Sequence, residues 1–118
     1  MVDNKNLENT QKVIKLLNEL GIRSGVDGFD YLRDIVVRLL EKEGEFVFNA
    51  RKEYTTTANK FGTSKSRVER SIRYISINIG NTVNTELVDT IFGAGVSQYG
   101  LTNSTLIKGI YNKIRFDM

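Results

Sequence analysis

The chain has 118 residues, of which 40% are hydrophobic and 26% charged, and its formal net charge is +3; this composition is ordinary for one folded domain with a single core. It contains no cysteine and no histidine, which excludes disulfides, a zinc site built from those ligands and a Ser-His-Asp triad. No apolar run reaches membrane-spanning length and the first ten residues are polar, so we expect a cytoplasmic protein with no membrane partner, no cofactor and no metal.

The first half of the chain predicts two amphipathic helices, and the lack of proline favours helix throughout. The first is expected over residues 7–20, overlapping a polar extension at residues 1–10, and the second over residues 29–42. A charged turn at residues 42–45 and a short helix or turn that starts with residues 46–48 should follow. The buried positions of the two helices are predicted to be Val13, Ile14, Leu16, Leu17, Leu20, Tyr31, Leu32, Ile35, Val36, Leu39 and Leu40.

The segment YTTTANKFGTSKSRVERSIRYISINI, residues 54–79, is the most informative part of the chain. We interpret it as a helix-turn-helix whose first helix begins at Tyr54. Ala58 allows two helices to approach closely, and Gly62 can adopt the positive φ of a turn. Thr63 and Ser64, which follow the glycine, can each cap the second helix.

The second motif helix has two chemically different faces. One is an apolar stripe with helical spacing, consisting of Val68, Ile72, Ile75 and Ile79. The opposite side carries polar and charged residues, namely Ser66, Arg70 and Arg73 with Glu69 on one flank and Arg67 and Tyr74 on the other. Arginine can donate to guanine edges, glutamate can accept from cytosine N4, and serine can bind base or phosphate. Such a helix is typical of one that enters the major groove of DNA.

The basic excess of the chain is confined to this region. Residues 51–73 carry 7 basic and 2 acidic side chains, whereas residues 1–50 carry 7 and 9, and residues 74–118 carry 3 and 3. Local positive charge attracts phosphate even when the overall charge is small. We therefore predict double-stranded DNA as the partner, weighed against the common alternative of a solvated basic helix.

The rest of the chain predicts two more helices around a glycine-rich loop. A short helix is expected over residues 85–92, and GAGVSQYGL, residues 93–101, should be irregular because its glycine spacing matches no phosphate-binding loop. Asn103 is predicted to cap a final helix over residues 104–116. Its inner side should be Leu106, Ile107, Ile110, Ile114 and Phe116. Residues 1–118 are thus expected to form one all-α domain of about six helices around the helix-turn-helix, with the motif at about residues 54–79.

Four segments of the chain resemble the C-terminal DNA-binding effector domain of the stage 0 sporulation protein A family, the sporulation response regulators of endospore-forming Firmicutes. SRVERSIRY, residues 66–74, is similar to the family's SRVERAIRH, and GVDGFDYLRDIV, residues 25–36, to its KGYxYLREAI. IFG, residues 91–93, and LTNSTLI, residues 101–107, follow in family order, and the second of them is similar to PTNSEFIA. The resemblance covers about residues 11–118.

The resemblance implies binding to short DNA elements of the TGTCGAA type, often by tandem head-to-tail copies. A homodimer is the alternative arrangement on DNA. The resemblance also implies that Glu69, Arg70 and Arg73 read bases. It places Lys60, Thr63, Ser66 and Arg67 at or near the phosphate backbone. We also assign backbone contacts to their neighbours Ser64, Lys65 and Tyr74. The final helix is expected to contact a neighbouring copy on tandem sites, with Glu86, Asp89, Lys108 and Lys113 as candidate surface charges.

The chain also departs from the family pattern. Tyr74 stands where the family has histidine, Lys65 replaces a small residue, Thr55 replaces a proline, and Gly62 replaces Asn or Asp. The fifty residues before the motif show no βα alternation, so no receiver domain and no phosphoacceptor aspartate are predicted. The chain is then either an excised domain or a stand-alone paralogue of plasmid, phage or chromosomal origin; the polar N-terminus favours the second.

Three functions remain open at this point. The chain is a transcription regulator, a DNA-binding accessory factor of plasmid or phage maintenance or transfer, or a protein-interaction module with the same fold that does not touch DNA. An enzyme with a small-molecule substrate is not predicted, because no base is paired with a nucleophile by any recognisable spacing.

Overall fold

The computed structural model describes residues 4–42, 46–81 and 84–116, and every regular element in these ranges is helical. The elements are α1 (Asn4–Glu19), α2 (Asp27–Glu41), α3 (Ala50–Phe61), α4 (Lys65–Ile77), the 3-10 turn η1 (Ile79–Asn81), α5 (Thr85–Phe92), α6 (Val96–Tyr99) and α7 (Asn103–Phe116). The prediction of an all-α fold of about six helices is confirmed. It did not include η1 or the single turn α6.

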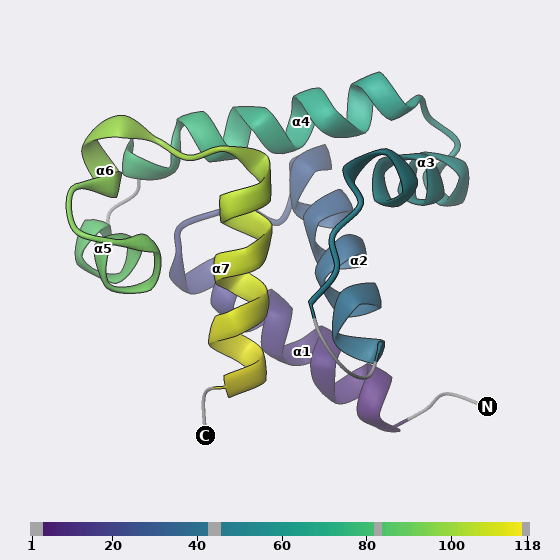
Figure 1. The fold of residues 1–118 in the computed structure, drawn as a ribbon, viewed down its shortest axis with the longest axis horizontal. Helices are drawn as coiled ribbons and strands as arrows, with labels where there is room; N and C mark the ends of the chain where they lie inside the picture. The colour runs from purple at the N-terminus through teal and green to yellow at the C-terminus, as the bar shows by residue number, and fades with distance from the viewer. Residues whose placement is uncertain (1–3, 43–45, 82–83, 117–118) are drawn as a thin grey trace.

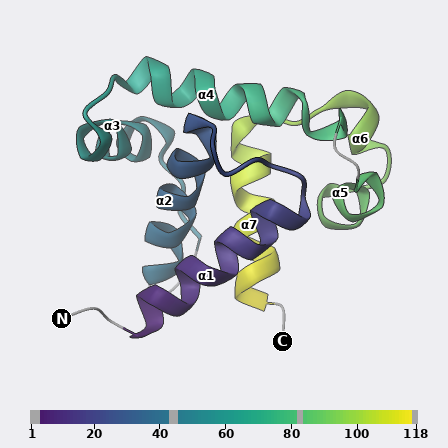
Figure 2. The ribbon, with the colours of Figure 1, turned by 180° about the vertical axis from the view of Figure 1, so that it is seen from behind.

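The helices are arranged so that α4 lies along one side of the molecule (Figure 1). The start of α7 and the start of α2 meet this helix from below, α3 lies beside its first half, and α5 and α6 lie beyond its end. Figure 2 shows from behind that α1 crosses both α2 and α7. The start of α1 and the end of α7 lie at the far end of the molecule from α4. The described helices lie below α4 or beyond its end, so its outer side is uncovered.

The centre of the core is α2, because its apolar residues recur at helical spacing on more than one face. All six positions of α2 that were predicted to be buried are buried, and Val37 is buried as well. The final helix agrees less well with its prediction, since Phe116 is 69% exposed and Tyr111 takes the buried place instead. The last turn of α7 therefore extends beyond the core.

The predicted start of the first motif helix at Tyr54 is wrong. The helix α3 begins at Ala50, because the Asn49 side-chain oxygen accepts a hydrogen bond from the Lys52 N–H at 3.2 Å. An asparagine in this position satisfies one of the open N–H groups of the first turn. The three threonines that lower helix propensity thus lie inside a helix that is already capped.

Residues 46–48, predicted to begin a helix or turn, form neither. Phe46 nevertheless packs against Tyr111 with ring centroids 4.8 Å apart, and Phe48 packs against Tyr54 at 6.1 Å. These two aromatic contacts hold residues 46–48 against the core. Most of the charged turn predicted at residues 42–45 lies outside the described residues.

Other boundaries differ from the prediction, since α2 begins at Asp27 rather than at residue 29 and α4 ends at Ile77 rather than at residue 79. The helix α1 begins at Asn4, so residues 4–10 of the polar extension are helical, and the loop predicted at residues 93–101 contains α6. The cap of α7 is Thr102 rather than Asn103, because the Thr102 Oγ1 accepts from the Thr105 N–H at 3.2 Å. The Asn103 side chain is therefore available for other contacts.

Within the described ranges, no helix combines the length and the apolar character that crossing a bilayer requires.

Candidate nucleic-acid interface

The turn between α3 and α4 has the geometry that the sequence predicts. Gly62 adopts φ +67°, in the left-handed region, and the Thr63 N–H donates to the Ala58 carbonyl at 2.9 Å. Ala58 is buried where the two helices approach each other. Ser64 caps α4, since its Oγ accepts from the Arg67 N–H at 3.1 Å. The helix-turn-helix is therefore formed by the residues that predicted it.

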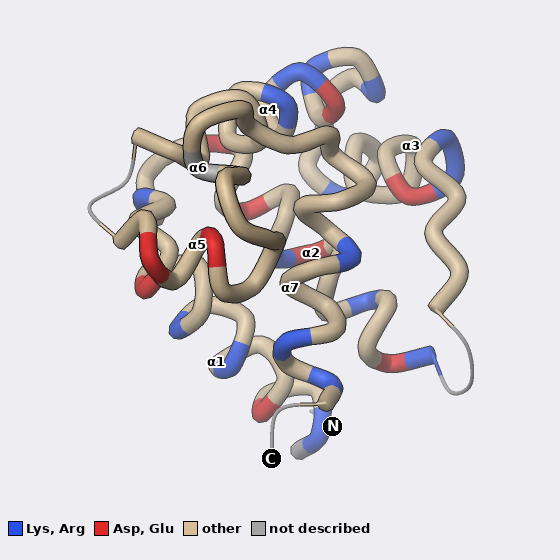
Figure 3. The backbone as a smooth tube through the Cα atoms, turned by 60° about the vertical axis from the view of Figure 1, so that its left-hand side comes forward, with Lys and Arg blue, Asp and Glu red and all other residues tan. Residues whose placement is uncertain are grey.

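The two faces of α4 are separated as expected. The apolar stripe is buried in full, including Ile79 in the turn after the helix. The polar side is open: Arg70, Arg73 and Ser66 are exposed, Glu69 is half-buried, and the Tyr74 ring is 69% exposed. Figure 3 shows Lys and Arg positions along α4 and at the start of α3.

A close approach of two backbones fixes the middle of α4. A Cβ atom at Gly28, in the first turn of α2, would lie 2.7 Å from the Ser71 carbonyl oxygen and 2.7 Å from the Ile75 Cδ1. Only glycine leaves room for this contact. The start of α2 therefore supports α4 from the inner side, directly beneath the exposed residues.

Asn103 joins three helices behind the same face. Its amide donates to the Glu69 carbonyl at 3.2 Å and to the Tyr54 hydroxyl at 3.1 Å, while its carbonyl accepts from the Ser76 hydroxyl at 2.9 Å. These bonds connect the start of α7 to α3 and to two turns of α4. Burial raises the pKa of Tyr54, and this effect outweighs the hydrogen bond from Asn103, which lowers the pKa. The phenol therefore stays neutral.

Three of the predicted DNA-contacting cations are paired with carboxylates in the free protein. The Lys60 Nζ lies 2.6 Å from Asp34, the Arg67 Nη2 lies 2.6 Å from Asp27, and the Arg73 Nη2 lies 2.5 Å from Glu69. Within the described part of the chain, no carboxylate pairs with Lys65 or Arg70. The cations of this surface thus form two groups, those paired with a carboxylate and those without a carboxylate partner among the described residues.

A charged cluster that the sequence did not predict lies behind Lys60, between α2 and α3. Arg38 donates to Asp34 at 2.7 Å, to Glu53 at 2.7 Å and to the Thr57 hydroxyl at 2.9 Å. Glu53 is only 1% exposed, and Lys42 binds its second oxygen at 3.2 Å. The signal that could have revealed the cluster is the presence of Asp34 and Arg38, one helical turn apart, within the otherwise apolar run of α2.

The electrostatics of the cluster favour its charged state. Burial alone would raise the pKa of the Asp34 carboxyl, but hydrogen bonds from Lys60, Arg38 and Thr57 outweigh it and hold the pKa below 3.8. Burial likewise opposes the charge of Arg38, and its bonds to Glu53 and Asp34 raise the pKa in spite of it. The cluster therefore fixes α3 against α2 by ion pairs.

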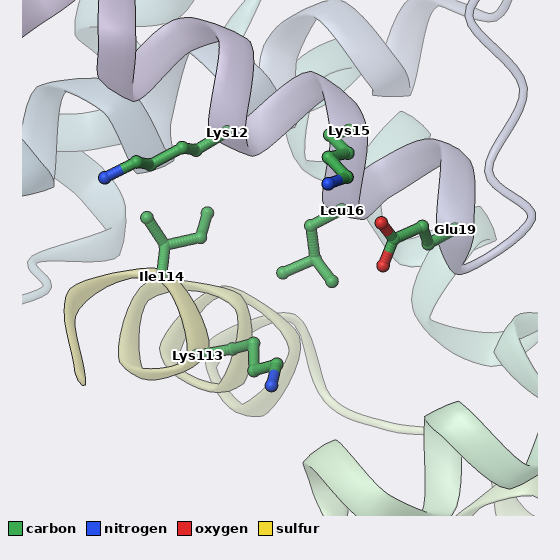
Figure 4. Close-up of a pocket in the computed structure, with 6 residues that line it drawn as sticks. All are labelled: Lys12, Lys15, Leu16, Glu19, Lys113 and Ile114. Carbon is green, nitrogen blue, oxygen red and sulfur yellow. The ribbon is translucent and has the colours of Figure 1, made fainter. Parts of the chain in front are cut away.

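A second group of lysines lies at the far end of the molecule. A cavity of about 200 Å³ between α1 and α7 is lined by Lys12, Lys15, Leu16, Glu19, Lys113 and Ile114. Leu16 and Ile114 point toward each other across it (Figure 4). Because this cavity is remote from α4, its lysines provide controls for charge substitutions in the motif.

The comparison with known families agrees with this geometry. A family model described as sporulation initiation factor Spo0A C terminal matches residues 13–114. The match covers nearly the whole chain, from the middle of α1 to the last turns of α7, and so includes the complete helix-turn-helix.

Proposed function

This chain belongs to the family of Spo0A C-terminal domains, which are DNA-binding effector domains, and we propose that it regulates transcription by binding a specific sequence of double-stranded DNA through the outer face of α4. The observation that carries the proposal is the combination of a capped, internally supported helix with an uncovered row of arginines. A DNA-binding regulator of this kind works in the cytoplasm, where the chromosome is.

Base reading is assigned to Glu69, Arg70 and Arg73. Arg70 is exposed and has no carboxylate partner among the described residues, so its guanidinium is available for the two acceptors of a guanine edge. Arg73 and Glu69 form an i,i+4 ion pair and act as one unit, in which the arginine donates to guanine and the glutamate accepts from cytosine. Adjacent C·G and G·C pairs, as in TGTCGAA, suit that arrangement.

Backbone contacts are assigned to the start of α4 and the residues around it. The N-terminus of a helix attracts anions through its open N–H groups and its dipole. Lys65 and Arg67 lie in the first turn of α4, where a cation opposes the helix dipole. Arg67 has a carboxylate partner in Asp27, but Lys65 has none among the described residues, so fold stability does not account for Lys65. Phosphate binding does account for it. The full assigned set is Lys60, Thr63, Ser64, Lys65, Ser66, Arg67 and Tyr74.

The target is proposed to be an element of the TGTCGAA type, and two elements in tandem should hold two copies of the chain. The charged residues assigned to the contact between copies, on α5 and α7, are Glu86, Asp89, Lys108 and Lys113. Cooperative binding to a tandem duplex would support this contact, whereas independent binding of two monomers would contradict it.

The proposal is tested by fluorescence-anisotropy titration of the protein against a labelled duplex with TGTCGAA and against the same duplex with the element scrambled. Preference for the intact element supports both the function and the target. Equal binding to both contradicts the target but keeps the DNA-binding function, and selection from random duplexes then gives the true element. Absence of binding to either contradicts the function.

The alternative role in plasmid or phage maintenance uses the same DNA-binding chemistry. It differs in where the sites lie, near an origin of replication or transfer rather than near promoters. Mapping of bound sites on the replicon that encodes the protein separates the two roles.

A further inference from the structure

The ion pairs at the motif surface are not all internal to the motif. Asp27 and Asp34 both belong to α2, outside the helix-turn-helix, and their partners Arg67 and Lys60 lie in α4 and α3. Both partners are assigned to DNA phosphates in the proposed function. The same two cations therefore have an internal carboxylate and an external phosphate as possible partners.

The Asp27 pair is open to solvent and links distant parts of the chain. The two side chains are 54% and 61% exposed, and their 2.6 Å contact joins the first turn of α2 to the first turn of α4. The contact with Asp27 raises the pKa of Arg67, with a further contribution from Tyr31. Because exposed ion pairs add little to stability, a DNA phosphate can replace the carboxylate without unfolding any element.

The Asp34 pair has an exposed cation and a fixed anion. The Asp34 side chain is 6% exposed and is held by Arg38 and Thr57, whereas the Lys60 ammonium lies at the surface. The carboxylate therefore stays in place when Lys60 turns toward DNA. A phosphate that approaches Lys60 meets a negative charge directly behind it.

We propose that Asp27 and Asp34 compete with DNA phosphates for Arg67 and Lys60 and thereby limit the affinity and the salt dependence of DNA binding. This inference rests on the proposed function. It adds two residues of α2 that set the strength of DNA binding without touching a base.

The expected effect follows from counterion release. Each phosphate that a free cation neutralises adds about 0.9 to the slope of log affinity against log salt concentration. A cation that already has a carboxylate partner contributes much less, because the pair is close to neutral before binding. Removal of the carboxylate charge should therefore raise both the affinity and the salt slope.

The variant that tests the inference is Asp27→Asn. Asp34 is less suitable because its bonds to Arg38 and Thr57 hold α3 in place. The matched control is Asp30→Asn, which removes the same charge from the same helix turn, but whose partner is Arg33 at 3.1 Å, outside the motif. Thermal unfolding of both variants checks that each is folded.

Anisotropy titrations between about 50 mM and about 200 mM salt give the measurement. Asp27→Asn is expected to bind the intact and the scrambled duplex about threefold to tenfold more tightly at the lower salt concentration, with a slope steeper by up to about 0.9. Asp30→Asn should stay within about twofold of the wild type on both duplexes. In an Arg67→Ala background, the gain from Asp27→Asn should disappear, because the cation that it releases is absent.

Two results would overturn the inference. Unchanged or weaker binding by Asp27→Asn would mean that the carboxylate positions Arg67 or that Arg67 does not meet phosphate. An equal gain in Asp30→Asn would mean that only the overall charge matters. If wild-type protein binds neither duplex, the proposed function fails together with the inference, whereas normal wild-type binding with either result above contradicts the inference alone.

Discussion

Lys65 differs from Lys60 although both are surface lysines of the motif. Lys60 is held by Asp34 at 2.6 Å, whereas Lys65 has no carboxylate partner among the described residues and lies in the first turn of α4. Since a lysine there opposes the helix dipole, removing it should not harm the fold. We therefore expect Lys65 to contribute more to DNA binding than Lys60 does.

Substitution of Lys65 by alanine should weaken binding to every duplex by roughly threefold to tenfold and lower the salt slope by about 1, because one phosphate contact is lost. Lys15→Ala is the matched control, since Lys15 is an exposed helical lysine beside the remote cavity between α1 and α7. Titrations at several salt concentrations give both quantities. Equal effects of the two substitutions would contradict a phosphate contact at Lys65.

Asp34 makes a prediction about stability and pH. Its carboxyl has a pKa below 3.8 in the folded protein, so the folded state favours the charged form. Its contribution to stability is therefore present above pH 3.8 and is lost as the pH falls through the lower folded-state value. Asp34→Asn should cost about 1–3 kcal/mol near neutral pH, and the difference from wild type should shrink in acid.

Urea unfolding followed by circular dichroism between about pH 7 and about pH 3 measures this difference. Asp30→Asn is the control, because Asp30 is exposed and pairs only with Arg33 at the surface in the described structure. A stability difference between wild type and Asp34→Asn that stays constant across this range would show that the charge of Asp34 is not what stabilises α3 against α2.

At the residue scale, the sequence predicted the faces of α4 but not the partners of its cations. Faces follow from periodicity within one helix, which is why Val68 and Arg70 were assigned correctly to opposite sides. Ion pairs such as Asp27 with Arg67 join residues far apart in sequence, so no local pattern contains them. Asn103 was assigned to a cap on local chemistry, and only the tertiary arrangement shows its bonds to α3 and α4.

At the element scale, the contact between α2 and α4 depends on Gly28. Alanine at this position would gain up to about 1 kcal/mol of helix propensity. The added Cβ would, however, lie 2.7 Å from the Ser71 carbonyl oxygen, a backbone atom that no rotamer change can move. The clash therefore outweighs the propensity.

Gly28→Ala is expected to lower the free energy of unfolding by about 1–3 kcal/mol and to weaken DNA binding by shifting α4. Gly25→Ala is the control, because a Cβ at Gly25 meets nothing within 4 Å; it should change stability by about 0.5 kcal/mol or less. Urea unfolding of the wild type and the two variants measures these free energies of unfolding. A Gly28→Ala variant as stable as Gly25→Ala would contradict the close approach of α2 to α4.

Element boundaries illustrate a second limit of sequence reasoning. The existence of the helices around the core was predictable from apolar periodicity. The start of α3 was missed because the Asn49 cap, which lies before the assumed start at Tyr54, was not recognised. The single turn α6 was missed because its glycine-rich surroundings favour irregular structure.

At the scale of the whole molecule, α2, α3 and α7 support α4 from one side and leave its other side open (Figure 1). The basic excess in the motif lies on that open side (Figure 3), although the whole chain is only +3. The far end of the molecule carries a second group of lysines, between α1 and α7. DNA binding through α4 therefore predicts that charge changes at the two ends have different consequences.

The central claim is that the outer face of α4 reads bases, and Arg70→Ala tests it most directly. The measurement is the ratio of affinities for the preferred duplex and its scrambled version, with Arg115→Ala, at the far end of α7, as the control. Arg70→Ala should lose about 1–3 kcal/mol of specific binding while it keeps most of its binding to the scrambled duplex, and Arg115→Ala should behave as wild type. Specific binding by Arg70→Ala equal to that of wild type would contradict the claim.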